Sequence, residues 1–227
     1  MKRIILLFLF CAVLTATVCA KEIGEKSFLS QFYIGGAVGL EKSGMNMDNK
    51  SFAWGHGGLE LGVSWLYFLT DNFGLGLDFH YAGFQGSDKE SWDRSVTPYR
   101  KSSFSLNTET WDLMAAGRVH FNPHGRMRVY MPFGGGLVIG HSRFKYTYDS
   151  WSDYTLRASA TSANVGAFAG LGLEYDLYEG AVTVGLETRY SLFRYDAQRL
   201  ATRVQADNHP GKQTYSYISL LAVASFQ

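Results

Sequence analysis

Apolar residues recur at every second position along most of the chain, and the positions between them carry glycine or charge. In residues 171–177 leucine and tyrosine flank Glu174 and Asp176, and in residues 77–81 leucine, phenylalanine and tyrosine flank Asp78 and His80. A strand places residues i and i+2 on the same face. Each such stretch therefore predicts a strand with one apolar face and one polar or glycine-rich face.

Eight strands are predicted by this alternation. They cover Ser30–Glu41, about Gly55–Phe68, Phe73–Tyr81, Trp111–Phe121, Arg128 to about Tyr146, Ala163–Leu177, Val182–Tyr195, and Tyr215 to the last residue. The fifth is the hardest to bound, because the glycines at 134–136 blur the alternation and Pro132 suits a continuous sheet only at a bulge. No internal repeat or linker indicates a second domain.

The connections between these strands alternate strictly between long and short. The long ones are the polar stretches Lys42–Ser51, Gln85–Ser103, Thr147–Thr161 and Asp196–Lys212, and the short ones are turns at Thr70–Asn72, Asn122–Gly125 and Tyr178–Gly180. Antiparallel outer-membrane barrels have short periplasmic turns and long external loops. The sequence therefore predicts an eight-stranded antiparallel up-and-down transmembrane β-barrel, with both termini periplasmic and the long loops extracellular.

The alternative is a lipocalin-like barrel, whose apolar face would fill the lumen. Eight strands enclose room for one filling of side chains or one small ligand, and the apolar face is too bulky for that. The other face carries the glycine and alanine that a crowded interior needs. Aromatic residues near strand ends further suit the two interfaces of a membrane; they are Phe32, Tyr33, Trp54, Tyr81, Trp111, Tyr130, Tyr190, Tyr215 and Tyr217.

The first twenty residues predict a cleaved signal peptide. Lys2 and Arg3 precede an apolar run from Ile4 to Leu14, and residues 18–20 offer small side chains for cleavage before residue 21. The run is too short to span a bilayer as a helix, although an N-terminal anchor remains an alternative. A lipoprotein modified at Cys19 is a second alternative, which the residues before Cys19 do not favour. Residues 21–227 then form a single barrel domain in the bacterial outer membrane.

The amino-acid composition limits the kinds of site that the mature protein can contain. Both cysteines of the chain lie in the predicted signal peptide, so the mature protein has no disulfide, thiol nucleophile or cysteine-bound metal, and we expect no cofactor. The net charge is +1, and no basic block is long enough for nucleic acid.

Several segments resemble a known family. They are residues 32–36 (Phe-Tyr-Ile-Gly-Gly), residues 71–75 (Asp-Asn-Phe-Gly-Leu), residues 132–136 (Pro-Phe-Gly-Gly-Gly) and the near-terminal Phe226. The chain is similar to outer-membrane β-barrel domain proteins, which include the OmpA-type and OmpX-type membrane domains and the opacity-like surface proteins. The resemblance implies that Phe226 is read by the barrel-insertion machinery, although Gln227 follows it here. It implies fold and location more than function, since members range from anchors to adhesins.

Charged residues at predicted lumen positions are the first functional candidates. They are Glu60, Asp78, Asp112, Arg118, Glu174, Asp176, Glu187 and Arg189. A narrow barrel favours ion pairs that plug the lumen. The alternative is that the charges line a water-filled passage, which would make the protein a narrow passive porin.

Enzymatic chemistry is a further alternative, because some small outer-membrane barrels modify lipid A with His, Ser and an acid at the external rim. His56, His80, His141 and Ser142 lie near predicted external strand ends. However, neighbours in a strand point to opposite faces, so His141 and Ser142 make a poor dyad. A metal site at His56 and His80 lacks a ligand-spacing motif.

The long loops are the favoured place for specific function, because binding residues concentrate in loops. Their aromatic residues Trp92, Tyr99, Tyr148, Trp151 and Tyr154 are candidate contacts for a host surface or a phage. We therefore expect a monomeric, non-enzymatic barrel surrounded by outer-membrane lipid and lipopolysaccharide, with a structural or adhesin-like role.

Overall fold

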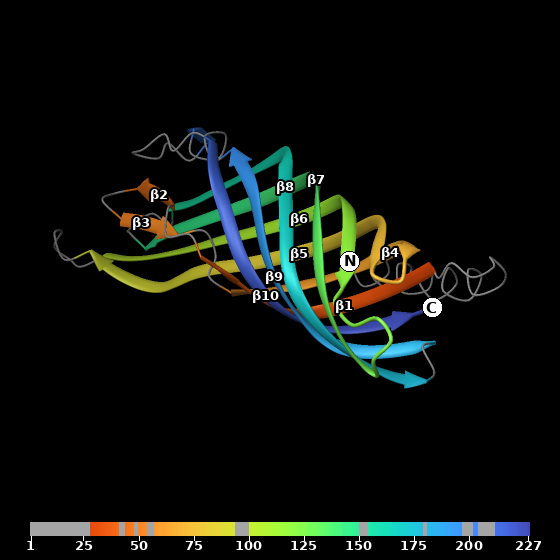
Figure 1. The fold of residues 1–227 in the computed structure, drawn as a ribbon. Helices are drawn as coiled ribbons and strands as arrows, with labels where there is room; N and C mark the ends of the chain where they lie inside the picture. Colours follow the sequence, from red (N-terminus) through yellow and green to blue (C-terminus); the bar gives the residue numbers. More distant parts are fainter. Residues whose placement is uncertain are drawn as a thin grey trace, which may run out of the picture.

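Eight antiparallel strands close into a barrel (Figure 1). The computed structural model describes residues 28–40, 44–47, 50–53, 57–93, 100–149, 154–178, 181–196, 202–203 and 212–227. The barrel strands are β1 (Phe28–Gly39), β4 (Gly57–Thr70), β5 (Phe73–Asp93), β6 (Arg100–His120), β7 (Met127–Asp149), β8 (Tyr154–Tyr178), β9 (Val182–Asp196) and β10 (Lys212–Phe226). Each pairs with its sequence neighbour in the barrel, and β1 pairs with β4 and β10 to close the ring. The predicted fold class is confirmed.

A short hairpin, β2 (Gly44–Met47) and β3 (Lys50–Ala53), lies within the stretch that the sequence predicts as the first polar connection. The predicted signal peptide lies outside the described residues. Within the described part of the chain, no helix is long and apolar enough to cross a membrane.

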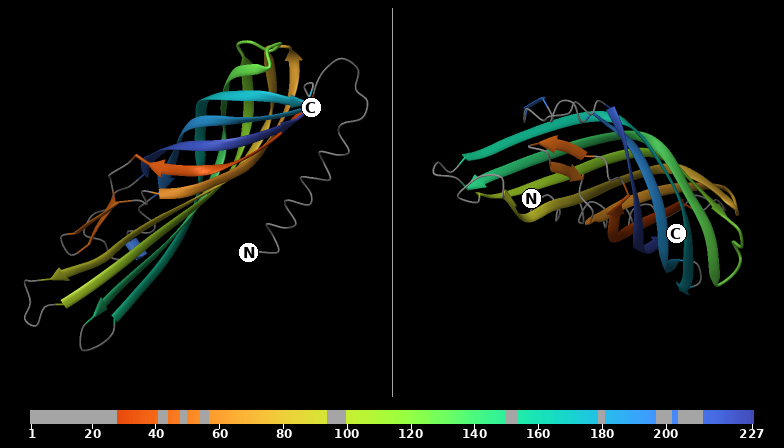
Figure 2. Two further views of the ribbon diagram at one scale, coloured as in Figure 1. Left: turned by 90° about the horizontal axis from the view of Figure 1, so that it is seen from below. Right: turned by 90° about the vertical axis from the view of Figure 1, so that its left-hand side faces the viewer.

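Strands β5 to β8 are much longer than the sequence predicts. They run 21 to 25 residues each and extend past the other strands at one end of the barrel (Figure 2). The predicted loop bounds Gln85–Ser103 and Thr147–Thr161 are therefore wrong, because both ends of each stretch pair as strand. We call this end of the barrel the loop end, and the end with the short β4–β5, β6–β7 and β8–β9 connections the turn end.

The β7 strand, whose alternation the glycines at 134–136 interrupt, is continuous from Met127 to Asp149. Its pairing with β6 keeps one register throughout, and Pro132 sits opposite Arg118 without a bulge. On the β8 side, Met131 and Pro132 drop out of the ladder while the register resumes unchanged at Phe133. A missing proline N–H therefore interrupts the ladder locally and does not shift it.

On the long strands, the outward face changes from apolar to polar part of the way along, and the inward face changes in the opposite sense. On β7 the outward positions are apolar or glycine from Met127 to Ile139, and then become His141, Arg143 and Lys145. The inward positions change in the opposite sense, since Phe144 and Tyr146 are buried. At a rise of about 3.4 Å per residue and a tilt of roughly 45°, the apolar stretch is about 29 Å high, close to the band of about 25 Å that such barrels present to lipid. The exchange therefore marks the edge of the membrane at the loop end.

Candidate functional site: the barrel lumen

The centre of the lumen is organised around Arg189 on β9, which is buried. Its Nε and Nη2 donate to Glu187 Oε1 at 2.8 and 2.6 Å. Its Nη1 donates to the Tyr33 hydroxyl at 3.0 Å and lies 3.5 Å from Asp78 Oδ2 and 3.8 Å from Glu60 Oε1. The guanidinium also lies 4.3 Å from the centres of the Tyr33 and Phe168 rings, a favourable cation–π geometry. One cation thus joins five strands: β1, β4, β5, β8 and β9.

Asp78 on β5 is the second centre of this network. It accepts from the Tyr33 hydroxyl at 2.8 Å, from the Ser64 hydroxyl, and from His80 Nδ1 at 2.8 Å. His80 Nε2 lies 2.6 Å from Asp112 Oδ2 on β6. Both ring nitrogens of this buried histidine therefore face a carboxylate, so an imidazolium satisfies both contacts.

A second group of charges lies nearer the turn end. Arg118 on β6 donates to Glu174 on β8 at 3.2 Å, and its guanidinium lies 3.8 Å above the Tyr130 ring. Tyr130 donates to Glu187 Oε2 at 2.9 Å, so this tyrosine links the second group to the Arg189 centre. Closer to the rim, Arg128 lies 3.0 Å from Asp176. The contacts run continuously from His80 to the turn-end mouth.

Buried aromatic rings lie on the loop-end side of the charges. Phe84 packs against Tyr215 and Tyr217 with ring centres 5.4 and 5.0 Å apart, and Phe193 lies 5.2 Å from Tyr215. Phe144 of β7 is buried in the same cluster. The lumen is therefore filled by two successive layers: the aromatic layer, made of these five residues, and the charged network on its turn-end side.

Glycine allows the large lumen side chains to fit. Gly172 on β8 lies under the Tyr130 ring, and a Cβ there would overlap the ring. Gly62 on β4 lies against Tyr33 and His80, where a Cβ would come within 2.7 Å of the His80 Cβ. The glycines on the polar face of the sequence pattern thus make space for the rings that carry the network.

The structure places all eight predicted lumen charges on the inner wall. Seven of them are buried, and Asp176 is half-buried at the turn-end rim. They form two connected groups: Glu60, Asp78, Asp112, Glu187 and Arg189 at the centre, and Arg118, Glu174 and Asp176 toward the turn end.

Sequence reasoning missed Tyr33, His120 and Tyr130 as members of the lumen. Of the aromatic residues predicted for the membrane interfaces, Tyr33, Tyr130, Tyr215 and Tyr217 are instead buried inside, so that prediction is wrong for these four. Parity is the signal that identifies Tyr33 and Tyr130, which share the inner face of their strands with glycine, whereas Tyr215 and Tyr217 share theirs with serines. Phe32, Tyr81, Trp111 and Tyr190 face outward as expected, and Trp54 lies outside the described residues.

The candidate catalytic residues do not converge. His80 lies inside the barrel, not at the rim, because β5 continues well beyond it. Ser142 faces the interior and pairs with Thr108 at 3.0 Å, while His141 faces outward. His56 lies outside the described residues. In the described part of the chain, no group of three or more His, Cys, Asp or Glu side chains is arranged to hold a metal.

One outward row does bring an acid, a histidine and a hydroxyl side by side. Glu109, His141 and Thr161 are opposite one another on β6, β7 and β8. Arg143 Nε donates to His141 Nε2 at 3.1 Å, which leaves Nδ1 to donate to Thr161 Oγ1 at 2.8 Å. A histidine that donates to a hydroxyl is not positioned to accept its proton, so the row lacks the geometry of an activated nucleophile.

The predicted loop aromatics fall mostly on strand ends. Trp92 is in β5, Tyr148 in β7 and Tyr154 in β8 by backbone pairing, while Tyr99 and Trp151 lie outside the described residues. Phe226 ends β10 on the outward face, with its ring centre 6.0 Å from that of Phe32. Its role as an insertion signal stays a prediction.

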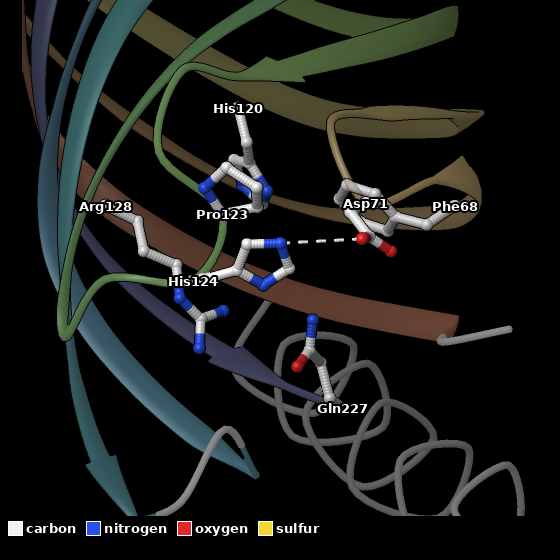
Figure 3. A pocket seen from close by; sticks show the side chains of 7 residues that line it. All are labelled: Phe68, Asp71, His120, Pro123, His124, Arg128 and Gln227. Atoms are coloured by element: carbon white, nitrogen blue, oxygen red, sulfur yellow. Dashed lines mark ion pairs between the residues drawn. The ribbon is translucent and has the colours of Figure 1, made fainter. Parts of the chain in front are cut away.

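The turn-end mouth holds an open hollow of about 170 Å³ (Figure 3). Its lining residues are Phe68, Asp71, His120, Pro123, His124, Arg128 and Gln227. The ion pair between His124 and Asp71, at 3.6 Å, joins two side chains that are 82% and 73% exposed. Such exposed pairs hold a geometry weakly, so the hollow is a solvated rim and not a built site.

Several solved structures are similar to this chain at low sequence identity. Neisserial surface protein A is 16% identical, with 88% of this chain and 97% of that chain covered and a TM-score of 0.39. Ail, the attachment invasion locus protein of Yersinia pestis, is 14% identical (87% and 99% covered, TM-score 0.40), and the outer membrane protease OmpT of Escherichia coli is 9% identical (89% and 96% covered, TM-score 0.47). At these values, the neighbours do not indicate what this chain binds or does.

No curated protein sequence matches the chain. The family model described as "Outer membrane protein beta-barrel domain" matches residues 5–217, which is nearly the whole sequence. The closed ring of eight strands with an apolar outer band agrees with that match. The chain therefore belongs to the outer membrane protein β-barrel domain family and is a bacterial outer-membrane protein.

Proposed function

We propose that this protein is a non-enzymatic surface barrel that acts through its loop end while its lumen stays closed. The observation that carries the proposal is that the charged network and the aromatic layer follow one another along the inside of the barrel. Arg189 connects five strands at the centre, and the rings of Phe84, Phe193, Tyr215 and Tyr217 pack together on the loop-end side. A lumen filled in this way supports a structural or contact role in preference to transport.

We place the turn end in the periplasm and the loop end outside the cell. Short connections on the periplasmic side and long ones outside are the rule for these barrels. The long β5–β8 strands then carry a polar outer face beyond the membrane, and the strand positions of Trp92, Tyr148 and Tyr154 lie at this end of the barrel, toward a host surface or a phage. Tyr99 and Trp151 belong to the same two connections.

A narrow passive porin is the second candidate, and one observation favours it. At the centre, among the residues that the structure describes, the carboxylates of Glu60, Asp78, Asp112 and Glu187 pair with two cations, Arg189 and His80. An acidic excess attracts cations. The aromatic layer opposes passage, because no charge lines it among the described residues.

Lipid A modification is the enzymatic alternative, and lipid A mass spectrometry tests it. We expect the same lipid A species from cells with and without the protein, because His80 is buried and His141 donates to the Thr161 hydroxyl. Loss or gain of one acyl chain would contradict the proposal, provided that His141→Ala abolishes it. His124→Ala, an exposed histidine at the turn end, is the matched control and should leave any such change intact.

A further inference from the structure

Beyond the membrane edge, the outer wall of the barrel carries a cluster of cations that the lumen network does not use. Arg143 and Lys145 lie on the outward face of β7, and Arg157 lies on the outward face of β8. We call these three residues the basic patch. All three are exposed, and the Arg143 side chain is 60% exposed. The basic patch points outward from the barrel wall, on the same side of β7 and β8 as the residues that contact lipid.

The register brings two of these cations directly together. Lys145 is opposite Arg157 in the β7–β8 ladder, and Arg143 is opposite Ser159 two residues along. Arg203, from the β9–β10 connection, donates to the Ser159 carbonyl oxygen and adds a fourth cation beside them. Like charges directly opposite each other destabilise a strand pair. An anion that bridges Lys145 and Arg157 would turn this repulsion into two favourable contacts.

A nearby acid offsets one of the three charges of the basic patch and leaves the other two. On this face of the described residues, Glu109 is the acid in range, and its Oε2 lies 3.8 Å from Arg143 Nη2. The neighbours of Lys145 and Arg157 in the same row and the next are Ser105, Asn107 and Thr155, which are uncharged. The described side chains therefore leave a local excess of positive charge.

The height of the patch on the wall indicates what lies against it. Trp111, Ile139 and Ala163 form the last apolar row, and Trp111 packs on Tyr81 with ring centres 4.7 Å apart, as expected for a membrane-interface girdle. The patch begins two rows beyond, and Lys145 is about 20 Å along the strand from Ile139. At the tilt of roughly 45° this is about 14 Å above the last apolar row, so an outward side chain here faces the polar layer of the surrounding outer leaflet.

We propose that the basic patch binds the phosphate groups of lipopolysaccharide in the outer leaflet. The proposal rests on the orientation given above, with the loop end outside. Arginine presents a planar fork that matches phosphate oxygens, and lysine supplies a point charge beside it. Lys145 and Arg157 bind one phosphate between them, and Arg143 extends the contact toward the membrane. A sideways patch continuous with the lipid-facing band suits a membrane glycolipid better than a soluble polyanion arriving from above.

The test measures binding of fluorescent, phosphorylated lipopolysaccharide to the purified barrel in detergent. We expect Lys145→Gln with Arg157→Gln to weaken binding about thirtyfold, from roughly 1 kcal/mol per cation near a charged lipid surface. The matched control, Lys145→Arg with Arg157→Lys, preserves both charges and should bind as the native protein does. Arg126→Gln, an exposed change at the turn end, should also have no effect.

Chemically dephosphorylated lipopolysaccharide separates phosphate recognition from general lipid contact. It should bind weakly, and equally to the native protein and the double variant. Native-like binding of phosphorylated lipopolysaccharide by the double variant would overturn the proposal. The proposal would also be overturned if the double variant lost binding of a soluble sulfated polysaccharide but still bound lipopolysaccharide. The gel mobility of the double variant before heating shows whether it folds. If it does not fold, the single change Arg143→Gln tests the patch instead and should weaken lipopolysaccharide binding about fivefold.

Discussion

At the scale of single residues, the interior depends on charges whose partners come from different strands. Arg189 binds Glu187 on its own strand and forms longer ion pairs with Asp78 and Glu60 from across the barrel, and Tyr130 connects Glu187 to the Arg118 group. Removing one partner of such a group leaves an uncompensated buried charge, which costs far more than the intact pair contributes. The network therefore makes the folded barrel sensitive to a few positions.

Arg189→Met should lower the free energy of unfolding by about 3–5 kcal/mol, because Glu187 and Asp78 lose their buried cation. Urea unfolding of the refolded protein in lipid vesicles measures this. The matched control is Arg194→Met on the same strand, which removes an exposed cation and should change stability by no more than about 0.5 kcal/mol. Equal effects of the two substitutions would show that Arg189 does not organise the interior.

Gly172→Ala should destabilise the barrel by roughly 1–3 kcal/mol, because the added Cβ overlaps the Tyr130 ring and overpacks the lumen. Gly135→Ala, with only an ordinary contact at 3.6 Å from the Gly166 carbonyl oxygen, is the control. The same unfolding measurement applies to both. A neutral Gly172→Ala would mean that Tyr130 can move aside without loss of its contacts.

At the scale of elements, alternation predicted the strands of the membrane band and failed where the alternation changes sense. The loop predicted to end at Ser103 and the strand predicted to begin at Trp111 leave out Ser105 and Asn107, whose outward side chains are polar. Leu106 between these two residues is nevertheless buried, and the segment pairs on both sides. A strand that leaves lipid needs a polar outer face and can then use an apolar inner one. The pattern was present in the sequence, but with its two faces exchanged.

For the candidate site, the sequence predicted the face on which the lumen charges lie but not which of them are in contact. Parity alone placed the eight charges on the inner wall, because that face is fixed once the outer face must contact lipid. It did not indicate which charges meet, since Arg189 and Asp78 are far apart in the sequence and their contact depends on strand order and stagger around the ring. His80 was placed at the rim for a similar reason: the length of β5 beyond residue 81 was unknown.

Replacing residues Ser87–Lys101 with a short Gly/Ser connection should leave the barrel able to insert. This removes the ends of β5 and β6 together with residues 94–99 between them, and these ends pair mainly with each other beyond Gln85, where the β4 pairing ends. The variant should still migrate differently before and after boiling on a detergent gel, and should lose any adhesion phenotype that the protein confers. Identical mobility before and after boiling would show that these ends are needed to form the barrel.

At the scale of the whole molecule, the sheet closes into a ring, because β1 pairs with both β4 and β10. Closure is what allows a sheet to span lipid, since every backbone donor and acceptor there has a partner. The interior is then closed by two layers of different chemistry. Charge pairing joins the strands at the centre and turn end, and aromatic packing fills the space toward the loop end.

Planar-bilayer recording of the purified protein tests this central claim most directly. With both layers in place, we expect no stable, large conductance across the voltage range in which the bilayer itself is intact. Arg189→Ala leaves the aromatic layer in place, so it should permit at most small, brief openings. A reproducible porin-sized conductance of the native protein would contradict the closed lumen and favour the narrow porin.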